Sequence, residues 1–265
     1  MIRVRFVQPS GDPKWDAWAA RAESETNALI NSSQRKIKDT VYKEAQEWIV
    51  SIFHGKCAYC EVRLDVSQHR GDLDHFRPKN RVADQHGKRV SIRGSFHPGY
   101  FWLAYRLWNL LPSCISCNRP VKGPNGIVRG KWDRFPVAGS YAVSCSDDLQ
   151  REKPLLLNPY EDDPNRHLSF DVKTGMVTHK SSRGKVTIDT LGLNREGLVR
   201  ARLDTIERVQ SLWADYMKAI SRMNGDEADR IQRELSSYRS GIQPFAAAAR
   251  AMLSIMKQDA EARGL

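Results

Sequence analysis

Two cysteine pairs, Cys57-Ala-Tyr-Cys60 and Cys114-Ile-Ser-Cys117, decide the fold of this chain. A Cys-x-x-Cys turn directs two thiolates at one ion, so two such turns supply the four sulfurs of a closed tetrahedral zinc site. One bound zinc would pin the intervening residues as a loop. We therefore predict a structural zinc held by Cys57, Cys60, Cys114 and Cys117, with a redox-active dithiol as the alternative.

The length and composition indicate a chain with a substantial core. Its 265 residues are enough for one large domain or two small ones. No apolar run is long enough to span a bilayer, and the N-terminus lacks an apolar secretory segment. We therefore expect a cytoplasmic protein without membrane contact, in which paired cysteines favour metal over disulfide.

The positive charge of the chain is concentrated around the cysteines. The formal net charge is +11, and residues 51–140 hold 15 Lys and Arg against 6 Asp and Glu, a difference of +9. Basic residues spread evenly would indicate only a solvated surface. Their concentration on the segment with the cysteines favours a polyanionic partner such as nucleic acid.

Hydrophobic periodicity divides the chain into four segments. Residues 1–55 carry apolar stripes at helical spacing, and residues 56–137 contain the cysteine pairs. Residues 138–190 are irregular with short strands, and residues 191–265 are helical again. The pattern predicts an α+β protein whose cysteine-containing core is flanked by N- and C-terminal helical segments.

Particular residues predict the limits of single elements. A short strand is expected over 71–76, and a helix is expected to begin close to Asn109, with Pro112 in its first turn. A further helix is expected after Asn194 as its N-cap. Asn224-Gly225 is expected to end that helix.

The segment between the cysteine pairs also carries candidate catalytic residues. It contains Asp74-His75-Phe76-Arg77-Pro78-Lys79 and Asn109, and Asn118 directly follows the last cysteine. An Asp-His pair alone is common and carries little information. Together with Asn109, Asn118 and Lys122-Gly123, however, it resembles the HNH endonuclease family, which has a ββα-metal fold. The matched positions span residues 57 to 123.

The resemblance implies a role for each matched residue. His75 is the general base that activates water, and Asn109 orients it. Asp74 and Asn118 hold the catalytic divalent cation, while the four cysteines bind zinc away from the chemistry. Many family members have a histidine where this chain has Asn118. An amide oxygen is a hard ligand, so the catalytic cation is expected to be Mg²⁺ or Mn²⁺.

Hydrolysis of a phosphodiester needs these types of residue. It requires a base with a pKa near the working pH, which imidazole has, and a cation that offsets charge on the phosphoryl oxygens. Basic side chains flank the candidate site and are expected either to contact phosphates or to be solvated surface charges: Arg77, Lys79, Arg119 and Lys122.

Stretches outside this core carry a narrower resemblance. They are similar to the PtuB-like HNH subunit of Septu and retron-associated antiphage systems, and comprise residues 99–105, 135–136, 156–159 and 191–195. This resemblance implies a bacterial defence nuclease that acts with an ATPase partner of the ABC/SMC-like class.

The sequence therefore leads to one main hypothesis and one alternative. The main hypothesis is a zinc-stapled ββα-metal (HNH) core that hydrolyses nucleic acid, with DNA favoured over RNA. The alternative is a non-catalytic, zinc-stabilised module that binds nucleic acid or a partner protein. Such a module needs the same cysteines and charge, but it has no use for Asp74, His75 and Asn118 together.

Overall fold

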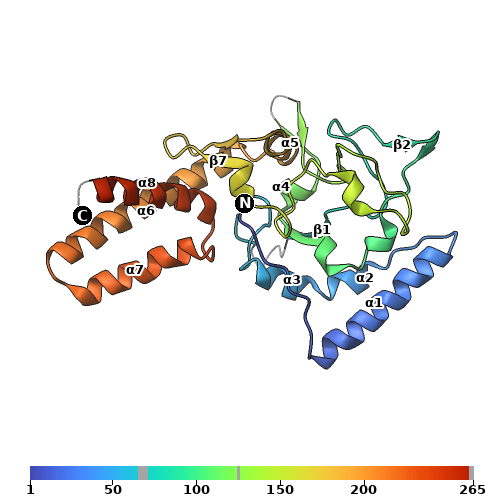
Figure 1. Cartoon of the computed structure of the whole chain (residues 1–265), viewed down its shortest axis with the longest axis horizontal. Coiled ribbons are helices and arrows are strands. Elements are labelled where there is room, and N and C mark those ends of the chain that lie inside the picture. The colour runs from blue at the N-terminus through green and yellow to red at the C-terminus, as the bar shows by residue number, and fades with distance from the viewer. Residues whose placement is uncertain (65–70, 124–125, 263–265) are drawn as a thin grey trace.

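The computed structural model describes residues 1–64, 71–123 and 126–262. It shows a mixed α/β body with small sheets, from which three C-terminal helices project to one side (Figure 1). The predicted mixture of helices and strands is confirmed. No helix within the described ranges is long and apolar enough to cross a membrane.

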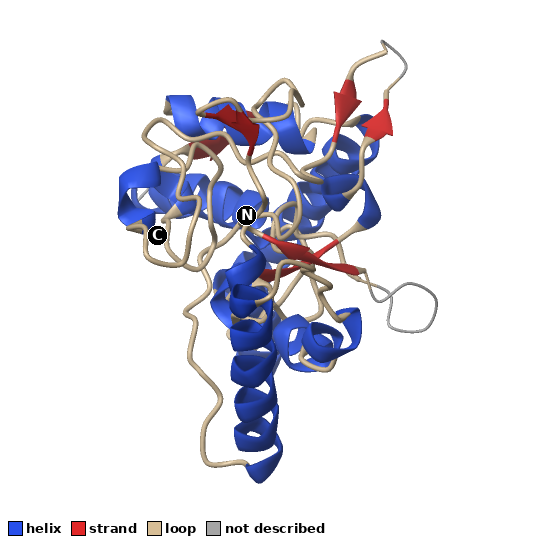
Figure 2. Ribbon diagram, turned by 90° about the vertical axis from the view of Figure 1, so that its right-hand side faces the viewer, coloured by secondary structure: helices blue, strands red, loops and turns tan. Residues whose placement is uncertain are grey.

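Three helices form the N-terminal segment: α1 (Pro13–Asn31), α2 (Asp39–Lys43) and α3 (Gln46–Ile52). The side chain of Asp12 caps α1 by accepting a hydrogen bond from the Lys14 N–H. Figures 1 and 2 show α1 at the edge of the body, and its buried side chains Trp18, Ala22 and Leu29 belong to the main apolar core. The helical prediction is confirmed here, with two short helices, α2 and α3, in the second half of the segment.

A two-stranded antiparallel sheet lies at the centre of the body. Strand β1 (Asp72–His75) pairs with β4 (Leu110–Ser113), and the helical turn α4 (Ile115–Asn118) follows β4. The predicted strand is confirmed. The helix predicted to begin near Asn109 is wrong, because that residue ends the 3₁₀ turn η2 (Leu107–Asn109) and the chain then extends as β4.

Pro112 lies in β4 rather than in a helix. Proline has no backbone N–H to donate to a neighbouring strand. It is therefore tolerated in a strand only where no neighbouring strand needs a hydrogen bond at that position. Within the described residues β4 pairs with β1 alone, and the Pro112 carbonyl accepts a hydrogen bond from the Ala58 N–H. Proline early in a helix and proline in an edge strand therefore look alike in the sequence.

Hairpins and short helical turns surround this sheet. The hairpins are β2 (Ser91–Ile92) with β3 (Ser95–Phe96), β5 (Val121–Lys122) with β6 (Val128–Arg129), and β7 (Leu168–Phe170) with β8 (Val177–His179). The 3₁₀ turns are η1 (Phe101–Leu103), η3 (Leu149–Glu152) and η4 (Pro164–Arg166).

Helix α5 (Ser182–Leu191) differs from the prediction of irregular structure over residues 138–190. The Ser181 hydroxyl caps its start by accepting from the Gly184 N–H, and Gly192 ends it in the left-handed conformation. Both are ordinary helix signals, a serine N-cap and a C-terminal glycine. The sequence therefore contained the evidence for this helix.

The C-terminal helices are α6 (Glu196–Ser221), α7 (Gly225–Arg239) and α8 (Ala246–Ala262). The predicted break is confirmed, since the Asn224 side chain caps α7 by accepting from the Glu227 N–H. Asn194 does not cap α6. Its amide instead exchanges two hydrogen bonds of 2.8 Å with the Val177 backbone, and Arg195 occupies the N-cap position.

Candidate active site and metal centre

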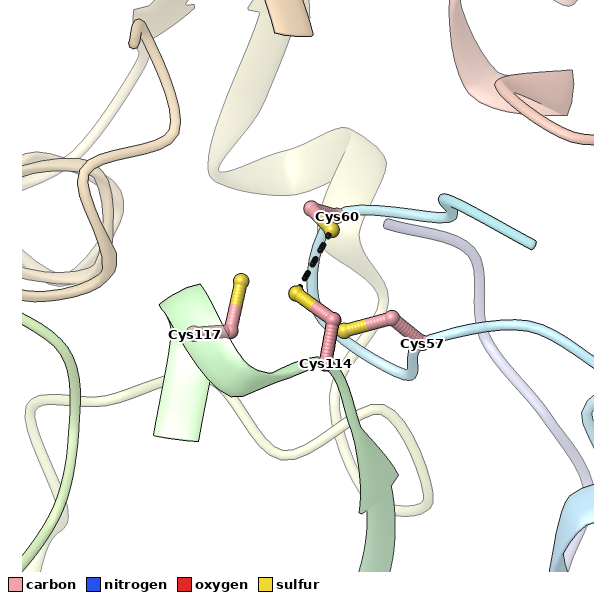
Figure 3. Close-up of side chains that lie close together, drawn as sticks. All are labelled: Cys57, Cys60, Cys114 and Cys117. Carbon is pink, nitrogen blue, oxygen red and sulfur yellow. Dashed lines mark hydrogen bonds between the residues drawn. The ribbon is translucent and has the colours of Figure 1, made fainter. Parts of the chain in front are cut away.

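The four cysteines converge between the end of α3 and the start of α4. Their sulfur atoms all lie within 4.8 Å of one another. Figure 3 shows the side chains pointing toward one another, and the Sγ atoms of Cys60 and Cys114 are 3.7 Å apart. Four ligands at a Zn–S distance of about 2.3 Å place the sulfurs about 3.8 Å apart in a tetrahedron. The cluster is therefore one that can hold a metal such as zinc.

A guanidinium group covers the cysteine cluster. The side chain of Arg195, which precedes α6, has nitrogen atoms 3.5–3.6 Å from the sulfurs of Cys60, Cys114 and Cys117. A zinc bound by four thiolates carries a net negative charge, which such a donor offsets. In the sequence, Arg195 stands out only as part of the stretch 191–195 that carries the family resemblance, and nothing there indicates a role at the metal.

A cavity of about 920 Å³ lies on the other side of α4, and it is lined by the predicted base His75 and by the predicted cation ligands Asp74 and Asn118, but not by Asn109. Cys117 faces the sulfur cluster, whereas Asn118, the next residue, lines the cavity. Side chains from β1, α2, α4 and the residues that follow β1 and α4 form the walls: Asp39, Tyr42, Asp72, Asp74, His75, Lys79, Asn118 and Arg119. The structure therefore brings Asp74, His75 and Asn118 to one cavity.

His75 is held in a defined orientation and protonation state. Its Nε2 atom lies 2.9 Å from the carbonyl oxygen of Ala104, and the Tyr42 ring packs edge-on against the imidazole with centroids 4.8 Å apart. A carbonyl only accepts, so Nε2 carries the hydrogen and Nδ1 is left as an acceptor. Burial, assisted by Lys79, lowers the pKa of His75 to about 3, so the ring is neutral at physiological pH.

Asn109 fixes the backbone that follows His75. Its side-chain oxygen accepts from the Arg77 N–H at 2.8 Å, and its amide donates to the carbonyls of Arg77 and Leu103. The side chain is fully buried. Among the described residues, the Asn109 side chain hydrogen-bonds to Arg77 and Leu103 and not to the imidazole, so it would position His75 through the backbone rather than by direct contact.

The Asp74 carboxylate lies in the interior beside the cavity. One oxygen accepts from the Lys131 ammonium at 3.0 Å and the other accepts from the Tyr59 hydroxyl. Burial raises the pKa of Asp74, although Lys131 and Tyr59 oppose that effect. Both carboxylate oxygens of the predicted metal ligand therefore already have protein partners.

Asp72 is a second β1 carboxylate in the cavity, and it is not among the residues predicted from the sequence. Alternate residues of a strand face the same side, so Asp72 and Asp74 share one face of β1. The Asp72 carboxylate accepts from the Asn118 amide at 2.9 Å and from Arg119 at 2.8 and 2.9 Å. Burial raises its pKa, but these bonds outweigh burial and the net pKa is lowered. The alternation in Asp72-Leu73-Asp74 was the available signal.

The four predicted phosphate-binding side chains have different surroundings. Arg77 is buried and paired with Glu152 at 2.7 Å, so its guanidinium is not available to a phosphate. Lys79 and Arg119 line the cavity, with Lys79 bound to Asp39 and Tyr42. Lys122 is exposed on β5 and does not line the cavity. Of the four, Lys79 and Arg119 are placed to meet an anion there.

Comparison with known proteins adds an independent observation. The chain is 35% identical over 170 residues to the Septu protein PtuA of Bacillus mycoides (strain KBAB4) and 31% identical over 198 residues to PtuB of the same strain. It is 27% identical over 197 residues to PtuB of Bacillus thuringiensis. The chain is related to the Septu proteins.

The extent of these matches differs between the relatives. They cover 63% of this chain for PtuA and 72% and 69% for the two PtuB proteins. The chain spans only 21% of PtuA, 62% of the first PtuB and 59% of the second. No protein-family model and no solved structure matches the chain.

Proposed function

We propose that this protein is a metal-dependent endonuclease of the HNH type that hydrolyses phosphodiester bonds in nucleic acid, with DNA the favoured substrate. One observation carries the proposal. A neutral histidine with a fixed tautomer lines the same cavity as two carboxylates and an amide on β1 and α4. A zinc-stabilised binding module needs the cysteines, but it gains nothing from that arrangement.

His75 is the proposed general base. Because Nε2–H donates to the Ala104 carbonyl, the lone pair of Nδ1 is free to accept a proton from an attacking water. Asn109 and Tyr42 hold the ring and its backbone in place. An anionic phosphate in the cavity would favour the protonated ring and raise the pKa of His75 toward the working range.

Asn118 and the carboxylates of β1 are the proposed cation ligands. Carboxylate and amide oxygens suit Mg²⁺ or Mn²⁺, which would offset charge on the phosphate and the leaving oxygen. Asp72 is the more accessible carboxylate, with a side chain 24% exposed against 3% for Asp74. We therefore add Asp72 to the predicted pair of Asp74 and Asn118.

Lys79 and Arg119 are the proposed phosphate contacts. Each is already paired with a carboxylate at the cavity, Lys79 with Asp39 and Arg119 with Asp72. A phosphate would have to compete with these carboxylates, and a cation bound at Asp72 would release Arg119 for that purpose. Cation binding and phosphate binding would then support each other.

The similarity to Septu proteins supports a role in antiphage defence and a partner within the same system. The segment of PtuA that matches this chain makes up 21% of PtuA. The same polypeptide therefore also contains a much longer stretch of other sequence. We propose that this chain associates with a separate protein, an ATPase of the ABC/SMC-like class as the family resemblance implies. The complex, rather than the lone chain, would then be the active form.

Plasmid nicking in Mg²⁺ tests the proposed activity, using both the purified chain and the complex recovered with it by affinity capture. His75→Ala and His75→Gln should lose cleavage while zinc content stays at one ion per chain. His179→Ala is the matched control, because His179 is exposed on β8, outside the cavity, and should cut normally. Undiminished cleavage by both His75 variants would refute the general-base assignment, and no cleavage by chain or complex in any divalent metal would refute the activity.

A further inference from the structure

Trp132 is exposed at the rim of the cavity. The residue is 54% exposed. All seven tryptophans lie in described parts of the chain, and the other six are buried or half-buried. Trp132 lines the cavity together with Asp72, His75, Asn118 and Arg119. A single exposed apolar side chain is common in proteins, but this indole lines the candidate cavity beside polar groups, where its ring can contact a ligand.

The backbone of Trp132 is strained. Its φ angle is +48°, in the left-handed region that bulky side chains rarely adopt and that costs on the order of 1 kcal/mol or more. Such strain persists only where surrounding contacts impose it. Here the Trp132 N–H donates to the Asn118 carbonyl at 2.6 Å, and the Lys131 N–H donates to the Cys117 carbonyl at 2.7 Å.

Neighbouring residues fix the direction in which Trp132 points. Lys131 is fully buried and donates to the Asp74 carboxylate and the His75 carbonyl. Gly130 approaches α4 so closely that an added Cβ would lie 1.9 Å from the Arg119 carbonyl oxygen. With Lys131 anchored inward, Trp132 is left on the cavity side.

We infer that Trp132 is a stacking platform for an unpaired base next to the phosphate that is cut. This inference rests on the proposed function and names its substrate class, nucleic acid with a single-stranded or displaced nucleotide at the site. Within a duplex the faces of a base are covered by its neighbours, so an indole reaches a base face only where stacking is interrupted. Lys79 and Arg119 in the same cavity are suited to the adjoining phosphates.

Binding of short oligonucleotides tests the inference independently of cleavage. The probe is a fluorescently labelled single-stranded DNA, bound in Ca²⁺ so that cutting is slow, and compared with strands that carry one abasic residue. Three variants are used with the full chain. Trp132→Asn removes the ring with a residue that tolerates the left-handed conformation, Trp132→Phe keeps a ring, and Trp213→Phe removes a half-buried indole from α6.

We expect Trp132→Asn to bind the intact strand roughly 5- to 150-fold more weakly than wild type, the range for loss of one stacked base. Its melting temperature should be at or above that of wild type, because Asn relieves the backbone strain. Trp132→Phe should retain most of the binding, and Trp213→Phe should behave as wild type. An abasic residue at the stacked position should weaken binding by wild type but not by Trp132→Asn.

Equal binding by wild type and Trp132→Asn, or no effect of any abasic residue on wild type, would overturn the inference and assign the exposed indole to another surface, such as a protein contact. Base-dependent binding that depends on Trp132 would support it even if the chain cut nothing. Cleavage that disappears in the His75 variants without any role for Trp132 would leave the proposed function intact.

Discussion

His75 illustrates how single residues set the chemistry of this cavity. One carbonyl fixes the tautomer of the ring, and burial keeps it neutral. The sequence singled out His75 but not this environment, because the Ala104 carbonyl comes from a segment 29 positions away. Asp72 was missed for a related reason: only the strand's orientation shows which of the two carboxylates is accessible.

The two carboxylates of β1 should respond differently to substitution. Asp74→Asn leaves the buried Lys131 ammonium without its charge partner, so it should destabilise the protein by about 3–5 kcal/mol. Asp72→Asn removes a partly exposed ion pair and should cost about 1 kcal/mol or less. Urea denaturation of both variants measures these costs.

The cation dependence of cleavage should also show the role of Asp72. Asp72→Asn should raise the Mg²⁺ concentration needed for half-maximal cleavage about tenfold or more, while remaining folded. An unchanged Mg²⁺ requirement in Asp72→Asn would remove Asp72 from the proposed cation site.

The pKa of His75 predicts a dependence of stability on pH. Its folded value of about 3 lies below the ordinary value of 6.5, so the unfolded chain binds the proton more strongly. The contribution of His75 to the free energy of unfolding is complete above pH 6.5. It falls by about 1.4 kcal/mol per pH unit as the pH drops from 6.5 toward 3. Unfolding measured without added divalent cation should show that loss in wild type.

His75→Gln is the reference for this measurement, because it cannot titrate in that range and retains the zinc ligands. The free energy of unfolding of wild type minus that of His75→Gln should decrease as the pH falls from 6.5 to 5. A difference that stays constant with pH would show that the imidazole is not held neutral by burial.

At the scale of single elements, α4 connects the two halves of the site. Within one helical turn Cys117 faces the sulfur cluster and Asn118 lines the cavity. The Cys-x-x-Cys spacing was sufficient to predict the cluster, because ligand geometry is local. The predicted helix near Asn109 failed, because only the pairing with β1 distinguishes an edge strand there from an early helix.

Arg195 joins the start of α6 to the metal centre, and its removal should weaken zinc binding. Arg195→Met keeps the apolar stem but loses the donors to three sulfurs, so zinc affinity should fall about 10- to 100-fold. Competition with a colorimetric chelator measures the change. Arg200→Met is the control, since Arg200 is exposed on the same helix; equal zinc affinity in the two variants would exclude this role for Arg195.

At the scale of the whole molecule, the C-terminal helices have an apolar core of their own, which is joined to the body by smaller contacts such as that of Ile2 with Ala246 and Ala247. Helices α6, α7 and α8 enclose their own apolar cluster, centred on Val209, Ile231 and Ala249. The sequence predicted the helices of this bundle from their periodicity. It did not predict their connection to the body through Arg195, which depends on tertiary contacts.

Zinc removal should therefore affect the two parts unequally. Because metal-binding energy is folding energy at such sites, a chelator should abolish amide protection in β1, β4 and α4. The interior of the α6–α8 bundle should keep its protection. Hydrogen–deuterium exchange resolves the two regions, and simultaneous loss of protection in both would show that they fold as one unit.

The most direct test of the central claim is the position of Mn²⁺ in crystals of the zinc-bound protein, determined by anomalous scattering. We predict a manganese peak in the cavity, in contact with Asn118 and a β1 carboxylate and distinct from the zinc peak at the four cysteines. Anomalous density at the cysteines alone, with the cavity empty at saturating Mn²⁺, would contradict the account.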